Sequence, residues 1–370
     1  MAKFTETKSV VENAIVVVVC TKKDDSRQRK LDEINRLCFS AGLNVVHDFY
    51  QIIKDFNKAT VIGAGKVEEI KNYINECEEI VDVVIVDYPL SGSQMKNLAD
   101  AFGVKVVDRV GLIIDIFAKG ALSREAKLQV KLAQDKYLLP RLSAVSGSSG
   151  RFGSGGVGMR GPGETKLELD RRLIQNEIDS LSKQIEKIKL QRQSTRKERL
   201  NSSVPKIALV GYTNAGKSSL LNALTKEKIY ADDKYFATLD TTTRKLFLGE
   251  GENAVLTDTV GFISDLPHQL VDAFSSTLEE TVDADLLLHV VDVSLDKESD
   301  GIKEFESNMK VTNDLLDSLG ATQNRIVVYN KCDKITRPML IKDNEVLVST
   351  KSKKGLDILL NKISKNLFKD

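Results

Sequence analysis

The sequence predicts an α/β protein in which a long antiparallel helical hairpin lies between a small α/β domain and a larger one. Three observations support this prediction. Short apolar runs alternate with helical patterns in residues 13–117, the alternation returns from residue 206 onward, and residues 119–200 hold two long helical patterns. Alternating strands and helices are typical of a mostly parallel sheet with helices on its faces. A chain of 370 residues has room for two or three domains.

The composition is typical of a globular protein with a core. Apolar residues make up 41% of the chain and charged residues 29%. The apolar run at residues 14–20 is too short to span a membrane, and the first residues carry no signal-peptide core. The four cysteines lack the paired spacing of a metal site, which is typical of reduced thiols. We therefore expect a cytoplasmic monomer without a membrane span.

Residues 1–118 are predicted to form the small α/β domain. Its strand-like runs lie at residues 14–20, 43–46, 81–86 and 104–107. Its helical patterns lie at residues 26–41, 66–77 and 91–102. The stretch Gly63-Ala64-Gly65-Lys66 resembles part of a phosphate-binding loop. No glycine lies five residues before Gly65, and Val67 replaces the hydroxyl residue, so we interpret the stretch as a turn that opens a helix.

Residues 119–200 are predicted to form the hairpin. A first helix is expected at residues 122–139 and a second at residues 166–199, where Thr165 and Glu168 match a capping box. Apolar residues of the second helix recur every seven positions, which indicates a coiled-coil-like seam. They are Leu167, Ile174, Leu181 and Ile188, with Ile178 and Ile185 beside them. At its usual rise per residue, this helix would be about 50 Å long.

Charge is concentrated in the hairpin. Residues 119–200 hold 18 Lys or Arg against 9 Asp or Glu, a net charge of +9, so the rest of the chain must carry −8 to give the total of +1. This asymmetry indicates contact with a polyanion, although a solvated helix face is the alternative interpretation.

The tip loop at residues 140–164 joins the two helices. Eight glycines lie from Gly147 to Gly163, and no acidic residue occurs from Arg141 through Gly163. Glycine lets a backbone approach a rugged surface closely, and arginine binds phosphates or stacks on bases. We interpret the loop as a tip that orders on structured RNA, with a flexible linker as the alternative. The predicted RNA contacts are Arg151, Arg160, Lys183, Lys187, Arg192 and Arg196.

Residues 203–370 contain a phosphate-binding motif in its expected context. The sequence Gly211-Tyr212-Thr213-Asn214-Ala215-Gly216-Lys217-Ser218 follows an apolar run at residues 207–210 and precedes a helical pattern at residues 219–224. Strand, glycine turn and helix are the context that this motif requires. Backbone N–H groups would face the phosphates beside the positive end of the helix. Lys217 would reach the β- and γ-phosphates, and the Ser218 hydroxyl would bind Mg²⁺.

Three further motifs follow in the order of a GTP-binding domain. Asp258-Thr259-Val260-Gly261 provides an aspartate that can hold Mg²⁺ through water and a glycine N–H that can sense the γ-phosphate. Asn330-Lys331-Cys332-Asp333 ends in an aspartate that can accept two N–H bonds from guanine, whereas adenine offers no such donor pair. Ser349-Thr350-Lys351 would support the base with a main-chain N–H. Together, the four motifs predict a Ras-like P-loop GTPase domain.

The segment between the first two motifs must close over the γ-phosphate. Residues 235–244 need one threonine to complete the Mg²⁺ shell, and chemistry alone does not choose among Thr238, Thr241, Thr242 and Thr243.

A family resemblance adds to this interpretation. Residues 155–165, followed by Leu167-Glu168 and Asp170-Arg171-Arg172, resemble the glycine-rich signature of the HflX family of ribosome-associated GTPases. Residues 107–109 with 113–117 resemble the N-terminal domain of the family, and residues 236–240 resemble its first switch. The resemblance covers essentially the whole chain. It implies a large-subunit-binding GTPase that splits stalled or idle ribosomes under stress, with the hairpin tip near the 23S rRNA of the peptidyl-transferase centre.

The resemblance also assigns site residues. It implies that Thr238 is the magnesium threonine, and Thr241 departs from the proline that relatives commonly carry. The predicted catalytic residues are Lys217, Thr238 and Gly261, and the predicted Mg²⁺ ligands are Ser218, Thr238 and Asp258. The predicted GTP/GDP contacts are residues 211–218 with Ser219, then Phe236, Ala237, Thr238, Leu239, Asp240, Asp258, Thr259, Val260, Gly261, Asn330, Lys331, Cys332, Asp333, Ser349, Thr350 and Lys351.

Two positions bear on turnover. Many GTPases place a water-orienting glutamine where this chain has Phe262, and a phenyl ring cannot hydrogen-bond water, so we expect slow intrinsic hydrolysis. Asn214 resembles the asparagine that ligates K⁺ in some GTPases without that glutamine. Two other functions remain open: a GTPase of large-subunit assembly, and an RNA-binding scaffold in which GTP is structural.

Overall fold

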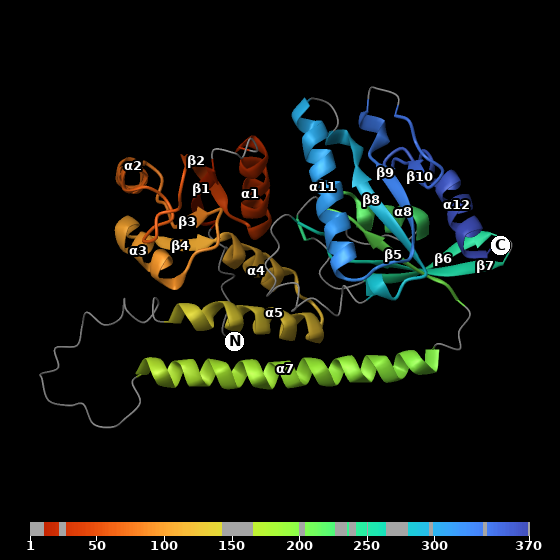
Figure 1. Cartoon of the computed structure of the whole chain (residues 1–370), viewed down its shortest axis with the longest axis horizontal. Coiled ribbons are helices and arrows are strands. Elements are labelled where there is room, and N and C mark those ends of the chain that lie inside the picture. Colours follow the sequence, from red (N-terminus) through yellow and green to blue (C-terminus); the bar gives the residue numbers. More distant parts are fainter. Residues whose placement is uncertain are drawn as a thin grey trace, which may run out of the picture. The chain divides into compact units, whose positions relative to one another are not determined.

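The computed structural model describes residues 11–21, 27–142, 166–199, 204–225, 235–236, 242–249, 251–263, 280–295, 299–335 and 339–368. The chain forms two compact units (Figure 1). Unit 1 comprises Met1–Lys119 and Gln134–Asp179, and unit 2 comprises Gly120–Ala133 and Ser180–Asp370. Among the residues that the structure describes, no helix is long and apolar enough to cross a membrane.

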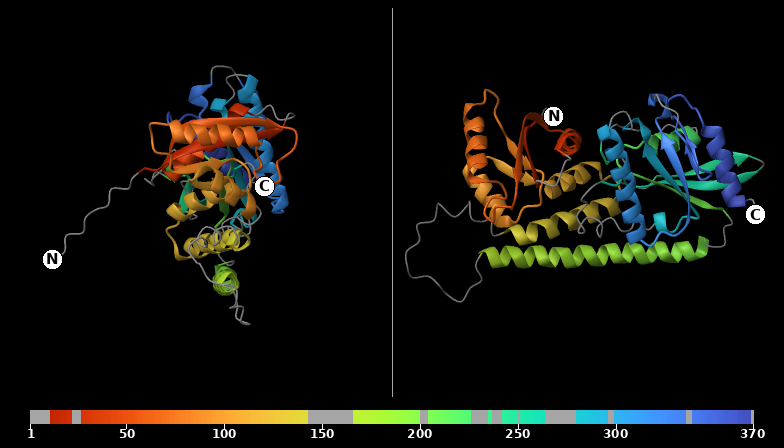
Figure 2. Two further views of the ribbon diagram at one scale, coloured as in Figure 1. Left: turned by 90° about the vertical axis from the view of Figure 1, so that its left-hand side faces the viewer. Right: turned by 45° about the horizontal axis from the view of Figure 1, so that its top comes forward.

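Unit 1 is built on a parallel four-stranded sheet in the order β2-β1-β3-β4. Its strands are β1 (Asn13–Thr21), β2 (Asn44–Ile53), β3 (Val83–Val86) and β4 (Lys105–Asp108). Its helices are α1 (Arg27–Ala41), α2 (Ala64–Glu76), α3 (Gly92–Phe102) and α4 (Arg109–Gly120). Helices α2 and α3 pack on one face through Ile70, Leu98 and Phe102, and α1 lies on the other side of the sheet (Figures 1 and 2).

The predicted parallel sheet of the first domain is confirmed, and the turn at Gly63 does open a helix, α2. Helix α4 was not predicted. Most of its residues are buried, including Val110, Leu112, Ile113 and Ile114, so its sequence lacks the polar face that marks an amphipathic helix.

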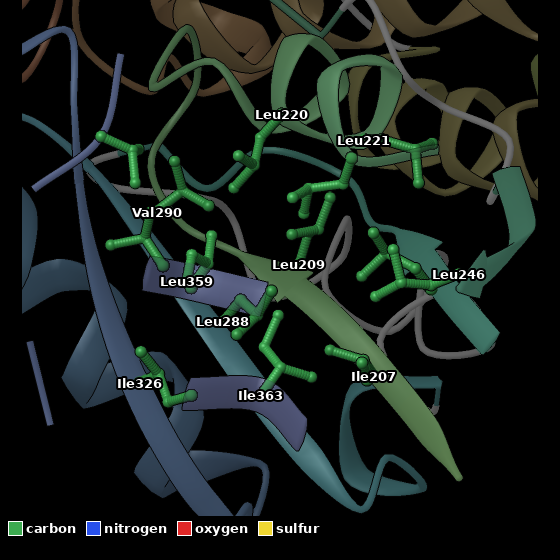
Figure 3. Close-up of a cluster of buried hydrophobic side chains, with 14 of the residues drawn as sticks. Ile207, Leu209, Leu220, Leu221, Leu246, Leu288, Val290, Ile326, Leu359 and Ile363 are labelled. Carbon is green, nitrogen blue, oxygen red and sulfur yellow. The ribbon is translucent and has the colours of Figure 1, made fainter. Parts of the chain in front are cut away.

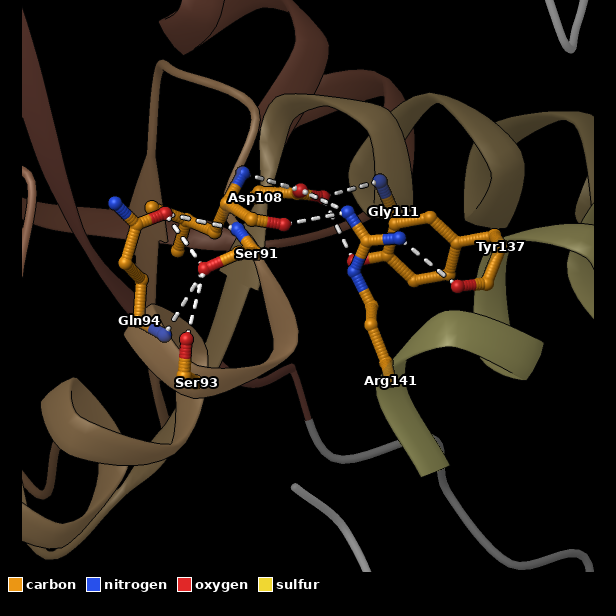
Figure 4. Close-up of polar contacts among 8 residues, drawn as sticks. Ser91, Ser93, Gln94, Asp108, Gly111, Tyr137 and Arg141 are labelled. Atoms are coloured by element: carbon orange, nitrogen blue, oxygen red, sulfur yellow. Dashed lines mark hydrogen bonds and ion pairs between the residues drawn. The ribbon is translucent and has the colours of Figure 1, made fainter. Parts of the chain in front are cut away.

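A buried network centred on Asp108 ties the chain after α5 (Arg124–Leu138) to β4 (Figure 4). The fully buried Asp108 carboxylate accepts hydrogen bonds from the N–H groups of Leu90 (2.9 Å) and Gly111 (2.8 Å), from the Tyr137 hydroxyl (2.7 Å) and from Arg141 Nη2 (3.2 Å). A Cβ on Gly111 would lie 2.8 Å from the Tyr137 oxygen, so only glycine lets the tyrosine approach. Burial and the nearby carboxylate both raise the pKa of Tyr137.

A second buried network surrounds Arg109, the first residue of α4. Its guanidinium lies 2.8 Å from Asp87 Oδ1 and 2.5 Å from Glu33 Oε1, and all three side chains are less than a tenth exposed. Burial lowers the pKa of Arg109, but the two carboxylates outweigh it and raise the pKa overall. Charges buried in this way are stable only as a complete set.

Both predicted helices of the hairpin are present. They are α5 and α7 (Lys166–Arg199), and the one-turn helix η1 (Leu139–Arg141) follows α5. Ile178 and Leu181 are buried, and the other seam positions of α7 are half-buried, as the heptad spacing predicts. Thr165 and residues 143–164 of the tip loop lie outside the described residues. The antiparallel arrangement of α5 and α7 stays a prediction, because both helices divide between the two units.

Unit 2 contains a six-stranded sheet in the order β10-β9-β8-β5-β7-β6, parallel except for the edge strand β6. Its strands are β5 (Lys206–Val210), β6 (Thr242–Gly249), β7 (Glu252–Asp258), β8 (Leu286–Asp292), β9 (Asn324–Asn330) and β10 (Glu345–Leu347). Its helices are α8 (Lys217–Thr225), η3 (Val293–Leu295), α11 (Ser299–Ser318), η4 (Cys332–Lys334) and α12 (Leu356–Phe368).

A leucine-rich core fixes α8 and α12 against one face of this sheet (Figure 3). Leu209 of β5 and Leu288 of β8 share this cluster with Leu220 and Leu221 of α8 and with Leu359 of α12. Because α8 begins where the loop after β5 ends, this packing sets the position of that loop.

Candidate nucleotide-binding site

The predicted motifs gather at one edge of the sheet of unit 2. Parallel strands end at the same edge, and ligands of α/β proteins bind beyond the carboxyl ends of the strands. The phosphate loop (residues 211–218) follows β5, and the Asp258–Gly261 motif ends β7. The base loop (residues 330–333) ends β9, and residues 349–351 follow β10. Residues 237–240, including Thr238, lie outside the described residues.

The phosphate loop requires glycine at two positions. Gly211 has φ +150°, and a Cβ there would lie 2.2 Å from the Val290 carbonyl oxygen. Gly216 has φ +91°, and a Cβ there would lie 2.3 Å from Asn330 Nδ2. Asn214 is left-handed as well, at φ +59°, a conformation that asparagine adopts more readily than most residues. The loop is therefore a tight turn wedged between β8 and the base loop.

Lys217 is a buried cation whose pKa is lowered. Its ammonium donates to the carbonyl oxygens of Gly211 and Tyr212, each at 3.0 Å. Burial lowers the pKa of Lys217 to about 8, and the carboxylate of Asp258 opposes this shift only in part. An anion bound at the loop would favour the charged form again, which suits this lysine to phosphate.

Ser218 and Asp258 provide the oxygen ligands that Mg²⁺ prefers. The Ser218 hydroxyl donates to Asp258 Oδ2 at 2.6 Å, and the aspartate is almost completely buried. Within the described residues, no cluster of three or more His, Cys, Asp or Glu side chains could hold a metal. A hydroxyl and one carboxylate fit Mg²⁺, because this ion commonly takes few protein ligands and completes its shell with water and phosphate oxygens.

Gly261 and Phe262 pack against the phosphate loop. A Cβ on Gly261 would lie 2.8 Å from Thr213 Cγ2 and 3.1 Å from Lys217 Nζ. The Thr213 N–H donates to the Phe262 carbonyl at 2.7 Å, and the Phe262 N–H donates to the Gly211 carbonyl at 3.1 Å. The Phe262 ring is buried in a core cluster with residues such as Val210 and Leu287. Phe262 is therefore a core residue, and its ring offers no group that could orient water.

The base loop is held by its first residue. Asn330 Nδ2 donates to the Ala215 carbonyl at 3.0 Å, and Asn330 Oδ1 accepts from the Thr350 N–H at 3.4 Å. Asn330 thus joins three of the motifs. Cys332 is buried among apolar side chains such as Tyr329, so it supports the loop from the core side.

Asp333 is available to a ligand. It is exposed, and its Oδ1 accepts a hydrogen bond of 2.6 Å from the buried Ser349 hydroxyl. This bond is the largest cause of the lowered pKa of Asp333. The carboxylate is therefore ionised at neutral pH and can accept a pair of N–H donors, as guanine recognition requires.

Sequence reasoning missed Asp292 at this edge. It ends β8, and its Oδ2 lies 2.6 Å from Lys331 Nζ, which also donates to the Asn214 carbonyl at 2.9 Å. The available signal was an acidic residue directly after an apolar strand, the same pattern that identifies Asp258.

Comparison with known proteins identifies the family. Three family models match in succession: "GTP-binding GTPase N-terminal" over residues 28–118, "GTP-binding GTPase Middle Region" over 120–199 and "50S ribosome-binding GTPase" over 206–331. The GTPase HflX of Caldanaerobacter subterraneus is 48% identical over 97% of this chain and 81% of its own length. The chain belongs to the HflX family. The HflX of Escherichia coli is 38% identical over 96% of this chain and 83% of its own length.

Solved structures agree with this membership. The SsGBP–GDP complex is 25% identical, with a TM-score of 0.52 over 96% of this chain and 98% of its own. A GTP-binding protein of Sulfolobus solfataricus with GDP gives a TM-score of 0.51 over 96% of this chain and 99% of its own. As an HflX GTPase with a P-loop GTPase domain, the protein hydrolyses GTP to GDP and phosphate.

Proposed function

We propose that the protein binds the large (50S) ribosomal subunit and uses GTP to split stalled or idle ribosomes under stress. The match of residues 206–331 to a 50S ribosome-binding GTPase family is the observation that carries this proposal. We assign residues 1–118 to an N-terminal domain, 119–200 to the hairpin and 203–370 to the GTPase domain. The protein acts in this proposal as a cytoplasmic monomer that associates with ribosomes.

The basic half of the hairpin is the proposed RNA contact, at the 23S rRNA near the peptidyl-transferase centre. Lys183 and Lys187 are exposed on α7 and so can reach phosphates. Arg192 and Arg196 lie on the same helix, but their side chains are outside the described set, as are Arg151 and Arg160 of the tip loop. Binding through such contacts weakens as salt rises, because phosphate neutralisation releases counterions.

The nucleotide chemistry follows from the site. The phosphate loop holds the phosphates of GTP, with Lys217 on the β- and γ-phosphates, and Asp333 accepts from guanine. Ser218, Asp258 and Thr238 would hold Mg²⁺, which supplies charge stabilisation on the γ-phosphate when bound. Both GDP complexes among the similar structures support guanine-nucleotide binding here.

The ribosome completes the catalytic site in this proposal. Phe262 lies in the core, so the residue after Gly261 contributes no water-orienting group. Groups supplied by a partner can raise the rate of GTP hydrolysis by roughly 10³–10⁵. Asn214 is the proposed K⁺ ligand, which predicts faster turnover in KCl than in NaCl, and equal rates would refute this part.

Phosphate release with and without purified large subunits tests the proposal. We expect strong stimulation by the subunits, and attachment in sedimentation with a non-hydrolysable GTP analogue but not with GDP. Lys217→Ala, which removes the phosphate-binding ammonium, should abolish both GTP binding and nucleotide-dependent attachment.

Three outcomes would contradict the proposal. Equal attachment with GDP and with the analogue would show that the nucleotide state does not control subunit binding. Binding to immature subunits without splitting of mature ribosomes would indicate an assembly GTPase. Unstimulated hydrolysis would instead favour an RNA-binding scaffold with structural GTP.

A further inference from the structure

We propose that Asp292 is a positioning residue for guanine-nucleotide binding, which acts through Lys331 to hold the phosphate loop against the base loop. Asp292 is the last residue of β8 and pairs in register with Asn330 of β9, where the base loop begins. The inference rests on the proposed assignment of residues 330–333 to guanine. It adds a residue outside the four motifs, which sets how long the nucleotide stays bound.

The Lys331 ammonium is shared between two segments of the chain. It lies 2.6 Å from Asp292 Oδ2 and donates to the main-chain carbonyl of Asn214 at 2.9 Å. The Asp292 and Lys331 side chains are 15% and 22% exposed, so solvent screens their attraction only in part. One cation therefore joins the end of β8 to the middle of the phosphate loop.

Asp292 is itself fixed in the orientation that this contact needs. Its Oδ1 accepts from the Ser294 N–H at 2.9 Å and from the Ser294 hydroxyl at 2.6 Å. One carboxylate oxygen thus anchors to η3, and the other faces Lys331. Because Ser294 already fixes the carboxylate, the Asp292 side chain needs no further ordering when a ligand binds.

Both residues that meet at this contact have an unusual backbone. Asn214 has φ +59° and Lys331 has φ +63°, in the left-handed region that residues other than glycine rarely adopt. Such conformations persist only where the surroundings hold them. Loss of the Asp292 charge should therefore loosen the phosphate loop and the base loop together. Because GDP and GTP share the guanine base and the β-phosphate, the two nucleotides should be affected alike.

Asp292→Asn tests this inference in the full-length protein. The amide oxygen can still accept from Ser294, so the substitution removes the charge and keeps the shape. We expect the dissociation rates of fluorescent GDP and of a fluorescent non-hydrolysable GTP analogue to rise about tenfold each, because charge-assisted hydrogen bonds are roughly twice as strong as neutral ones. Asp314→Asn removes the same charge from an exposed site on α11 and should leave both rates unchanged.

Repeating Asp292→Asn in a Lys331→Met protein distinguishes a positioning role of Asp292 through Lys331 from a general contribution to stability. With Lys331→Met already present, Asp292→Asn should not raise the dissociation rate further, because the ammonium through which Asp292 acts is absent. The same fold increase in both backgrounds, or unchanged rates in the single variant, would overturn the inference. Should Asp292→Asn fail to fold, Ser294→Ala tests the same carboxylate, with an expected rise of about threefold. Failure of the parent protein to bind guanine nucleotides would refute the assignment of the base loop instead.

Discussion

The two units place acidic residues at the same edge of a parallel sheet and use them differently. In unit 1, Asp87 follows β3 and Asp108 ends β4. Both are buried, and they face the guanidinium groups of Arg109 and Arg141, respectively. In unit 2, Asp258 and Asp333 each accept a hydrogen bond from a serine hydroxyl.

The aspartates of unit 1 therefore belong to the structural framework, and those of unit 2 belong to a binding site. A buried carboxylate with a cation as its partner is costly to disturb, because loss of either group leaves a charge without compensation. A serine hydroxyl can instead turn to a metal ion or keep one carboxylate oxygen in place while a ligand approaches the other. Strand-end aspartates in α/β proteins are therefore better judged by their partners than by their position.

The largest effect should follow from Asp333→Asn. The amide cannot accept both N–H groups of guanine, and hydrogen bonds to charged groups are the stronger ones, so the affinity for GTP and for GDP should fall roughly 10²–10⁴-fold. Calorimetric titration with GDP measures the loss. The thermal stability of the nucleotide-free variant should match that of the parent, because Asp333 is exposed. A large loss of stability would place Asp333 with the framework residues and break the comparison.

The converse variant is Arg109→Ala in unit 1. It leaves Glu33 and Asp87 buried without their cation, which should destabilise the unit by about 3–5 kcal/mol. Thiol labelling in urea can follow each unit separately, since Cys38 is buried in unit 1 and Cys332 in unit 2. We expect Cys38 to become reactive at lower urea and Cys332 to be unaffected.

The control for Arg109→Ala is Arg171→Ala, which removes an exposed arginine of α7 from the same unit. Its urea midpoint should stay at the parental value. An equal effect of the two substitutions would show that the buried triad contributes no more than any surface cation.

A smaller effect is expected for Tyr137→Phe. The substitution keeps the ring beneath Arg141 and removes one of the four donors to Asp108, which should cost about 1.5 kcal/mol of unfolding free energy. Tyr88→Phe, at a half-buried ring stacked on Phe56, is the matched control and should change stability less. Urea unfolding followed by far-UV circular dichroism compares the two variants. Indistinguishable midpoints would show that the hydrogen bond from Tyr137 to Asp108 does not stabilise the framework.

Local signals explain what could be predicted. The phosphate loop and Asp258 are each recognisable within a few residues, because strand, turn and helix follow one another in the chain. The contact of Asp292 with Lys331 and the Asp108 network could not be predicted in this way. Asp292 meets Lys331 only because β8 pairs with β9, and Asp108 meets Arg141 across 33 residues. Helix α4 was missed because burial on most sides removes the amphipathic period.

His289 lies on β8 and is buried close to two cations, Arg325 and Lys217. Burial is the main cause that lowers its pKa to about 3 from 6.5, and the charges of Arg325 and Lys217 act in the same direction. Its Nδ1 has no hydrogen-bond partner among the described residues. The imidazole is thus neutral in the folded protein throughout the mildly acidic range.

Stability should therefore fall as pH drops below 6.5. Between about pH 6.5 and 3 the unfolded chain binds a proton at His289 that the folded protein does not, so the free energy of unfolding decreases by roughly 1.4 kcal/mol per pH unit from this residue alone. In His289→Leu this contribution is absent, and the dependence on pH between 6.5 and 4.5 should be shallower by that amount. Urea midpoints across this range measure the difference, with His47→Leu, an exposed histidine of unit 1, as the control. Parallel pH profiles for the parent and His289→Leu would contradict the prediction, because they would show that His289 binds its proton equally well in the folded and the unfolded chain.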